Sequence, residues 1–430
     1  MKNLTLCDYD DRDMKRAVAC LVVPWLRVAS AFLPAVAGVA QDPEASPTSA
    51  RTSRRVVAAD SRQTSATETR AVSRPRLDAA ALHLAYAGPS KAWPRPIVDP
   101  GVVFVELGLV PKPPHPAEDP WSKEKESLGR ALFFDGRLSG PGQMACASCH
   151  DAELGFADGR STSFGHGFTP LPRNAPSILN AAFGSSFFWD GRAKSLQDQA
   201  LAVFENAGEM HTSGAEVVAK LKSSAGYRKM FEAAYGAGEP SLDRTLSALA
   251  TFERTIASDG SAPFDKFLKG EAQAIDDAAV RGLHLFRTTA RCANCHHGQL
   301  LTDGLFHDLG LSYYGRKFED LGRYRVTKDP VDVGRFKTPS LRNVERTAPY
   351  MHLGLFDLDG VLNMYSAGMA TLKRPESRKD DPLFPTKSTL LQRLDLSAEE
   401  KADLKSFLGS LTERRRRLRP PDLPPMGGLR

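Results

Sequence analysis

Apolar positions recur at helical spacing over most of the chain from about Val102 onward. The period of three to four residues is clearest in three stretches, Leu128–Leu132, Leu196–Phe204 and Leu242–Ile256. Such a period is typical of helices that bury one face, whereas strands alternate with a period of two. Strand signals are scarce, so the pattern predicts a mainly α-helical protein.

Two long stretches between the predicted helices are interrupted by proline and glycine, namely 165–176 and 304–339. Loops of this length without secondary structure are uncommon in compact domains. A bulky cofactor would give them a surface to pack against. We therefore expect long loops that pack on a bound group.

An internal repeat divides the chain. The segment Gly129–Phe133 (GRALF) precedes a Cys-x-x-Cys-His motif that is followed by Asp-Gly, and Gly282–Phe286 (GLHLF) precedes a second such motif, also followed by Asp-Gly. Internal similarity of this kind indicates related structural units. We predict two helical domains, at residues 96–270 and 271–412.

The N-terminal part differs from the rest in composition. Residues 1–40 resemble an export signal, with early charges, an apolar run and small residues before Gln41. A membrane anchor is the alternative, but Pro24 and Arg27 interrupt the apolar run. We expect cleavage and a periplasmic protein. Residues 41–95 are predicted to be a disordered linker, since 41–76 hold almost no large apolar side chains.

The net charge of +6 is concentrated near the ends of the chain. Residues 413–430 carry six arginines against two acids, and 41–76 carry seven arginines against four acids. The run Arg414–Arg417 could contact nucleic acid or an anionic membrane, but a solvated tail fits an exported protein better. We predict a basic tail over 413–430 and no nucleic-acid partner.

Four of the six cysteines lie in the two repeated motifs, and the other two, Cys7 and Cys20, lie in the predicted signal. Two thiols three positions apart can add to the vinyl groups of one haem, and the next histidine can then bind the iron. The motifs predict two covalent c-type haems, held by Cys146, Cys149 and His150 and by Cys292, Cys295 and His296.

Zinc sites and thioredoxin-like redox pairs are the alternatives for Cys-x-x-Cys. A zinc site of this type needs a second ligand pair, usually about 15 to 20 residues away, and neither segment provides one. A redox pair gives the histidine no role, although the histidine occurs in both motifs. Covalent haem remains the interpretation that uses every residue.

The chain resembles the bacterial di-haem cytochrome c peroxidases, a family that includes the protein-modifying enzyme MauG. The resemblance runs from about residue 120 to 370 and lies in several motifs in a fixed order: LFFDxRLS (132–139), Cys-x-x-Cys-His, RNAP (173–176), FWDGR (188–192), TPSLRN (338–343) and APYMH (348–352). It implies two cytochrome c-like helical domains with one haem each.

The resemblance implies that the first haem is the peroxide site. His166 stands sixteen positions after His150 and matches a histidine that caps the iron until activation. MauG-like enzymes lack this cap. Glu209 matches the family carboxylate above the haem, which takes a proton from one peroxide oxygen and returns it to the other. Glu205 is its nearby competitor.

Further residues take roles from the same resemblance. Trp189 matches the tryptophan between the two haems, where an indole can relay electrons, although core packing would also explain it. Asn174, Thr347 and Pro349 match the ligands of one calcium ion, a hard cation that prefers oxygen donors.

The distal ligand of the second iron is left open between two chemistries. The matching stretch, Leu358–Gly368, places Tyr365 at the ligand position, as in MauG. Met364 and Met369 are close enough to supply the methionine of the peroxidases. Adjacent helical residues point about 100° apart, so only one of Met364 and Tyr365 can face the iron.

These features together predict a cytochrome-c peroxidase that reduces hydrogen peroxide with electrons from a small cytochrome c or cupredoxin. The first alternative is a MauG-like enzyme that oxidises aromatic residues of a protein substrate. The second is a non-enzymatic di-haem electron carrier, which gives Glu209 and Trp189 no role. A homodimer is compatible with each of these functions.

Overall fold

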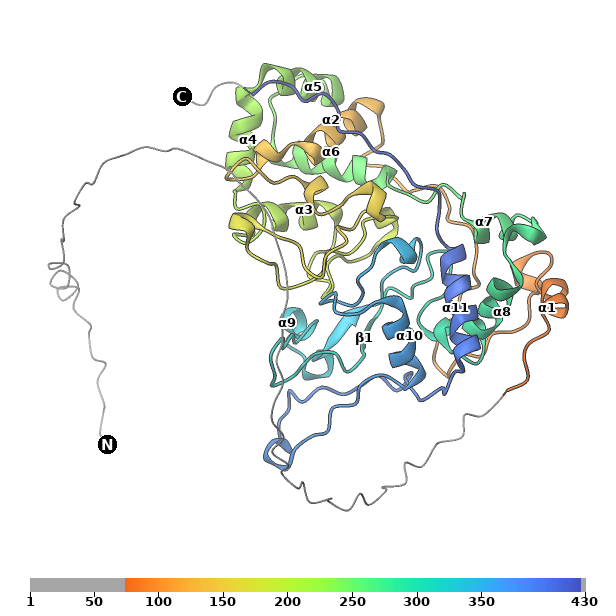
Figure 1. The fold of residues 1–430 in the computed structure, drawn as a ribbon. Coiled ribbons are helices and arrows are strands. Elements are labelled where there is room, and N and C mark those ends of the chain that lie inside the picture. Colours follow the sequence, from red (N-terminus) through yellow and green to blue (C-terminus); the bar gives the residue numbers. More distant parts are fainter. Residues whose placement is uncertain (1–73, 427–430) are drawn as a thin grey trace, which may run out of the picture. The chain divides into compact units, whose positions relative to one another are not determined.

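The computed structural model describes residues 74–426, and these are mainly helical, as predicted (Figure 1). The predicted signal peptide lies outside the described residues, and so does most of the predicted linker. No helix in 74–426 has the length and apolar character needed to cross a membrane. The helices are α1 (Ala79–Ala85), α2 (Lys123–Phe134), α3 (Leu196–Glu205), α4 (Gly214–Ser223), α5 (Ala225–Tyr235), α6 (Leu242–Thr255), α7 (Pro263–Leu268), α8 (Asp277–Arg287), α9 (Tyr324–Thr327), α10 (Leu358–Ser366) and α11 (Ala398–Ser410).

Serine side chains define where several of these helices begin. Ser122, Ser195, Ser241 and Ser397 each accept a hydrogen bond from a backbone N–H in the first turn of α2, α3, α6 and α11. At Ser397 the Glu400 side chain also bonds back to the cap backbone. Such caps satisfy N–H groups that have no partner inside the helix.

The described residues contain one small sheet. Strand β1 (Phe306–Asp308) pairs antiparallel with β2 (Arg335–Lys337), and His307 lies opposite Phe336. Both strands and the short helix α9 lie inside the stretch 304–339 that was expected to be a loop, and residues 309–334 connect the two strands. The sheet therefore gives this loop fixed ends.

Two separate clusters of buried apolar side chains form the core. The N-terminal core extends from Leu128 to Ile256 and is built mainly by α2–α6. The C-terminal core combines residues of 79–107 with residues from Phe264 to Leu411, mainly on α1, α7, α8 and α11. Cys146 of the first motif packs at the edge of the N-terminal core, and Cys292 of the second motif packs at the edge of the C-terminal core.

The sequence repeat corresponds to a repeated helix crossing. Helix α2 packs on α6, and α8 packs on α11. A Cβ at Gly129 would lie 1.9 Å from the carbonyl oxygen of Ala248, and a Cβ at Gly282 would lie 2.0 Å from that of Asp403. The glycine of GRALF and of GLHLF is therefore needed because the two helix backbones touch there.

The predicted linker extends too far toward the C-terminus. Within 41–95, residues 79–85 form α1, and Tyr86 and Trp93 are 1% and 5% exposed in the C-terminal core. The Arg287 guanidinium lies over the rings of both aromatic residues. These large apolar side chains lie beyond the polar stretch that suggested disorder, so the boundary was placed too late.

Residues 413–426 do not form a free tail, although Arg414, Arg415 and Arg417 are exposed as predicted. The Glu413 carboxylate is buried and accepts the N–H of Asp259 at 2.7 Å. Further along, the carbonyl of Pro424 accepts Arg137 Nη2 at 2.9 Å, and Leu423 packs on the N-terminal core. The arginine run is thus part of a segment that follows α11 and binds the N-terminal core.

Candidate functional site

Each Cys-x-x-Cys segment folds into a short 3-10 helix, Cys146–Ser148 in the first site and Cys292–Asn294 in the second. Side chains three positions apart lie on the same side of a 3-10 helix. Both thiols of each motif can therefore face one edge of a single planar group. None of the four motif cysteines is in a disulfide, and burial raises the pKa of the Cys292 and Cys295 thiols to about 12.

The two motif histidines have matching hydrogen bonds. His150 Nδ1 lies 3.0 Å from the carbonyl oxygen of Phe156, and His296 Nδ1 lies 3.0 Å from that of Leu301. Burial lowers the pKa of both imidazoles. A neutral ring that donates through Nδ1 leaves Nε2 as the metal-binding atom. Both sites therefore fit a haem whose iron is bound by the motif histidine.

Glu209 and Glu205 have different surroundings. Burial raises the pKa of Glu209, while Arg192 and a 2.7 Å hydrogen bond from Asn206 Nδ2 oppose this effect. The charge of Glu209 also raises the pKa of Cys149, so this carboxylate lies on the first-motif side. Glu205, the last residue of α3, is exposed. Of the two, Glu209 has the surroundings of a group that exchanges protons in a partly dry site.

His166 lies beside the loop that carries Glu209. Its backbone N–H donates to the carbonyl of Gly208 at 2.9 Å, and its ring stacks on His211 with 4.3 Å between ring centroids. Sequence reasoning did not single out His211. Its proximity to His166 arises from contact between two loops, and no local sequence pattern encodes it.

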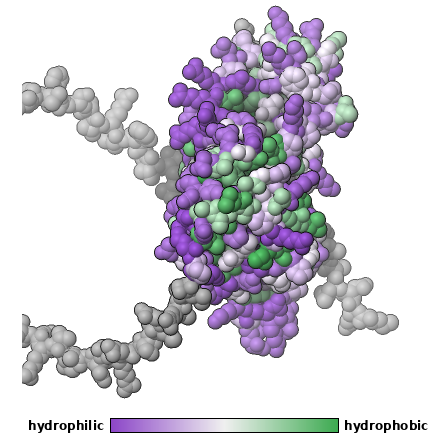
Figure 2. All heavy atoms as spheres, turned by 90° about the vertical axis from the view of Figure 1, so that its right-hand side faces the viewer, coloured by the Kyte–Doolittle hydropathy of each residue, from purple (hydrophilic) through white to green (hydrophobic). Residues whose placement is uncertain are grey.

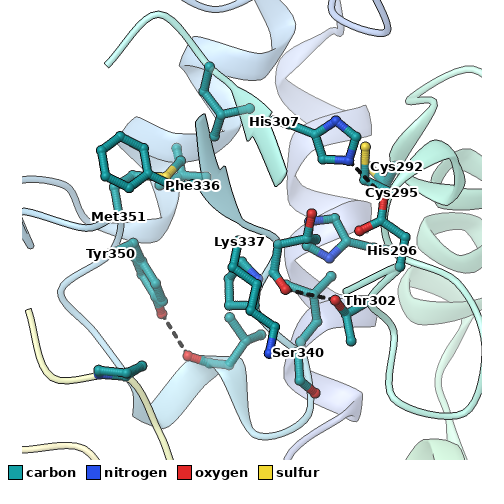
Figure 3. Close-up of a pocket in the computed structure, with 18 of the residues that line it drawn as sticks. Cys292, Cys295, His296, Thr302, His307, Phe336, Lys337, Ser340, Tyr350 and Met351 are labelled. Carbon is teal, nitrogen blue, oxygen red and sulfur yellow. Dashed lines mark hydrogen bonds and ion pairs between the residues drawn. The ribbon is translucent and has the colours of Figure 1, made fainter. Parts of the chain in front are cut away.

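A cavity of about 520 Å³ lies at the second site (Figure 3). Residues 174–189 line it together with residues from 286 onward, so both halves of the chain contribute. Figure 3 shows Cys292, Cys295 and His296 on one side and Tyr350 and Met351 on the other. Its size is that of a site for a large organic cofactor.

Trp189 lies in the wall of this cavity. Its indole Nε1 donates to the carbonyl of Asn174 at 2.9 Å, and its ring meets His352 edge to face at 6.4 Å. His352 in turn stacks on Phe336 at 3.7 Å. Burial lowers the pKa of His352 to about 4, so Trp189 has a neutral imidazole beside it.

Tyr365 lines the same cavity, on α10. Burial raises the pKa of its phenol, and the nearby Cys295 and Cys292 thiols add to this effect. Within residues 74–426 its hydroxyl makes no hydrogen bond to another residue, and neither Met364 nor Met369 contributes to the cavity wall. An oxygen donor in this position could bind ferric iron at the second site.

The residues matched to calcium ligands belong to the wall of the same cavity. Asn174, Thr347 and Pro349 all line the cavity, although 173 positions separate Asn174 from Thr347. The Asn174 Nδ2 group donates to the carbonyl of Arg160 at 2.8 Å, which leaves Oδ1 for another partner. Amide, hydroxyl and carbonyl oxygens of this kind suit a hard cation.

A buried ion network next to the cavity was also missed. Arg173 binds both carboxylate oxygens of Asp320, at 2.7 and 2.9 Å, and Asp190 at 2.7 Å. These bonds connect the RNAP and FWDGR segments to the long loop between β1 and β2. Asp320 lies 147 positions from Arg173, so only the fold reveals the network.

Comparisons with known proteins agree with these features. The family model of di-haem cytochrome c peroxidase matches residues 123–273. The methylamine utilization protein MauG of Methylorubrum extorquens is 42% identical over 72% of this chain and 84% of its own length. Cytochrome-c peroxidase IdrP1 of Pseudomonas sp. (strain SCT) is 36% identical over 71% and 85%.

A solved structure extends the comparison to three dimensions. A MauG-like protein associated with microbial copper homeostasis superposes with a TM-score of 0.63 and 36% identity, over 71% of this chain and 93% of that chain. The helical cytochrome c-like fold that the sequence predicts is thus confirmed, and family membership implies two c-type haems. The chain belongs to the di-haem cytochrome c peroxidase family, which includes MauG.

Proposed function

We propose that this protein reduces hydrogen peroxide to water at the first site, in the periplasm. Electrons come from a small cytochrome c or cupredoxin and enter through the second site. The observation that carries the proposal is the half-buried Glu209, whose pKa is raised, on the Cys149 side of the first motif. Several relatives are named cytochrome-c peroxidase, which agrees with this chemistry.

Glu209 acts as the acid and base of the reaction. The haem, when bound through Cys146, Cys149 and His150, supplies the redox chemistry. The Glu209 carboxylate takes a proton from one peroxide oxygen and returns it to the other, which lets the O–O bond break toward water. A pKa above the ordinary glutamate value of 4.5 brings this group closer to the working pH.

The proposed electron path runs through the cavity wall. Trp189 lines the cavity that holds the second motif, and Arg192, three residues along the chain, lies close enough to Glu209 to lower the pKa of that carboxyl. An indole in this position can relay an electron between the two haems. The neutral His352 beside it supports this role, because no imidazolium opposes oxidation of the indole.

His166 supplies the gate in this proposal. When haem is bound through Cys146, Cys149 and His150, the His166 imidazole would block the peroxide position until it moves away. A calcium ion held by Asn174, Thr347 and Pro349 would fix the segment between the two sites, because these residues come from both halves of the cavity wall.

A MauG-like oxidation of a protein substrate is the second candidate. One observation favours it: Tyr365 lines the cavity of the second site, and Met364 and Met369 lie outside the lining found among the described residues. A phenolate is a hard oxygen donor that favours ferric iron, whereas a methionine thioether favours ferrous iron. His166 favours the peroxidase.

Substitution of Glu209 tests the proposed function. Glu209→Gln should lower steady-state peroxide turnover by about two to four orders of magnitude, the range for a positioned acid or base, with little change in either haem spectrum. Glu205→Gln is the matched control and should retain wild-type turnover, since its carboxylate is exposed. Full activity in Glu209→Gln with loss in Glu205→Gln would assign the role to Glu205.

A further inference from the structure

The loop that carries His166 is attached to the loop that carries Glu209. The His166 N–H donates to the carbonyl of Gly208, and a Cβ on Gly165 would lie 1.9 Å from that same oxygen. The backbones of the two loops are therefore in contact. Movement of one loop must break contacts made by the other.

Among the described residues, the His166 ring has one aromatic partner and no side-chain hydrogen bond. Its Nδ1 atom is buried and has no hydrogen-bond partner in the part of the chain that the structure describes. Its ring lies parallel to the ring of His211, with an interplanar angle of 10° and 4.3 Å between centroids. A stacked ring keeps its neighbour from rotating, which is the function of an aromatic pair of this kind.

His211 is itself held firmly. Its Nδ1 lies 3.1 Å from the carbonyl of Ala207, and its backbone N–H donates to Asn206 at 3.0 Å. Both partners belong to the turn that precedes Glu209. The position of the His211 ring is therefore set by the same turn that orients the proposed acid and base.

We propose that His211 is a positioning residue that holds the imidazole of His166 in its capping orientation and couples release of this cap to the placement of Glu209. The inference rests on the proposed function, because it assumes that His166 caps the first iron. It adds a residue outside the motif resemblance and makes the conformation of each loop depend on the other. When His166 leaves, the turn at 206–211 loses both the stacked ring and the bond to Gly208.

Two substitutions test the role of the His211 ring without straining the backbone. His211 has a positive φ of 49°, which asparagine tolerates well, so His211→Asn removes the ring without new backbone strain. His211→Phe keeps a flat ring, and four phenylalanines among the described residues already have positive φ, Phe156, Phe168, Phe188 and Phe318. His211 is exposed, so neither change disturbs the core.

The experiment compares both variants with wild type and with His166→Gly, which lacks the cap. The readouts are the high-spin fraction of the ferric first haem and the rate at which fully oxidised protein reacts with peroxide in stopped flow. His211→Asn should raise both by about threefold to tenfold, the range that an aromatic pair provides, and His211→Phe should stay near wild type. The second haem's spectrum serves as an internal control for folding.

The outcomes distinguish the inference from the proposed function. If His166→Gly differs from wild type while His211→Asn does not, His211 has no positioning role and the cap stands without it. If His211→Phe behaves like His211→Asn, the stacked ring is not what holds His166. If His166→Gly itself matches wild type, the cap is absent and the gated mechanism fails as well.

Discussion

The two haem-attachment sites share a scaffold on one side and differ on the other. In both, a glycine lets two helices touch, a 3-10 helix presents two thiols, and the motif histidine bonds to a buried residue with positive φ, Phe156 or Leu301. The groups around the motifs differ: the charge of Glu209 acts on Cys149 of the first motif, with His166 beside the Glu209 loop, whereas Tyr365 lines the cavity of the second motif. The local structure that presents the Cys-x-x-Cys-His motif is thus repeated in the two sites, whereas the other side chains around each site differ.

The surface next to the second site is rich in apolar side chains. Figure 2 shows apolar side chains gathered on the face that carries α1, α7 and α8. Leu84 on α1 is 80% exposed and Val105 is 53% exposed, and the carbonyl of Val105 accepts the N–H of Gly298, two residues after His296, at 2.8 Å. The second motif therefore lies close to the molecular surface near Val105.

The largest effect is expected from substitution of Tyr365, which most distinguishes the second site from the first. Tyr365→Phe should change the ferric spectrum of the second haem completely, because phenylalanine cannot bind iron. Wild type should lack the near-infrared band that marks histidine/methionine ligation. A band that is present in wild type, survives in Tyr365→Phe and vanishes in Met364→Leu or Met369→Leu would assign the ligand to a methionine.

Alanine at the shared helix crossings tests the repeated half of the comparison. Gly282→Ala and Gly129→Ala should each destabilise the protein by about 3 kcal/mol, because the new Cβ would overlap a backbone oxygen. Gly409→Ala, on α11, meets only the Glu345 side chain at 3.6 Å and should be neutral or slightly stabilising. Denaturant unfolding measures all three, and equal effects would mean that the crossings do not need glycine.

The smallest effect is a shift in pH dependence at the first site. Glu209 must be ionised to accept a proton, so turnover should fall as pH drops through its raised pKa. The Asn206 hydrogen bond lowers that pKa. Asn206→Asp removes the donor, adds a negative charge and keeps the acceptor for Gly208 N–H, so it should move the acid limb to higher pH. Glu205→Gln should leave the pH profile unchanged. If the acid limb does not move in Asn206→Asp, then that limb does not report the ionisation of Glu209.

The sequence predicted the features that depend on local pattern. The helical periods, the two Cys-x-x-Cys-His motifs and the glycines of the repeat are visible in short windows. The packed segment 413–426, the His166–His211 stack and the bond between Arg173 and Asp320 were not predicted. Each of these joins positions far apart in the chain, and composition around each position gives no sign of the partner.

Stopped-flow spectroscopy of wild-type protein tests the central claim most directly. Fully oxidised and half-reduced samples are mixed with hydrogen peroxide, and the first haem is followed. The gated peroxidase predicts that only the half-reduced protein reacts rapidly, because one electron is needed before His166 leaves. Rapid reaction of the fully oxidised protein, with no gain on half-reduction, would contradict the gate and favour the MauG-like alternative.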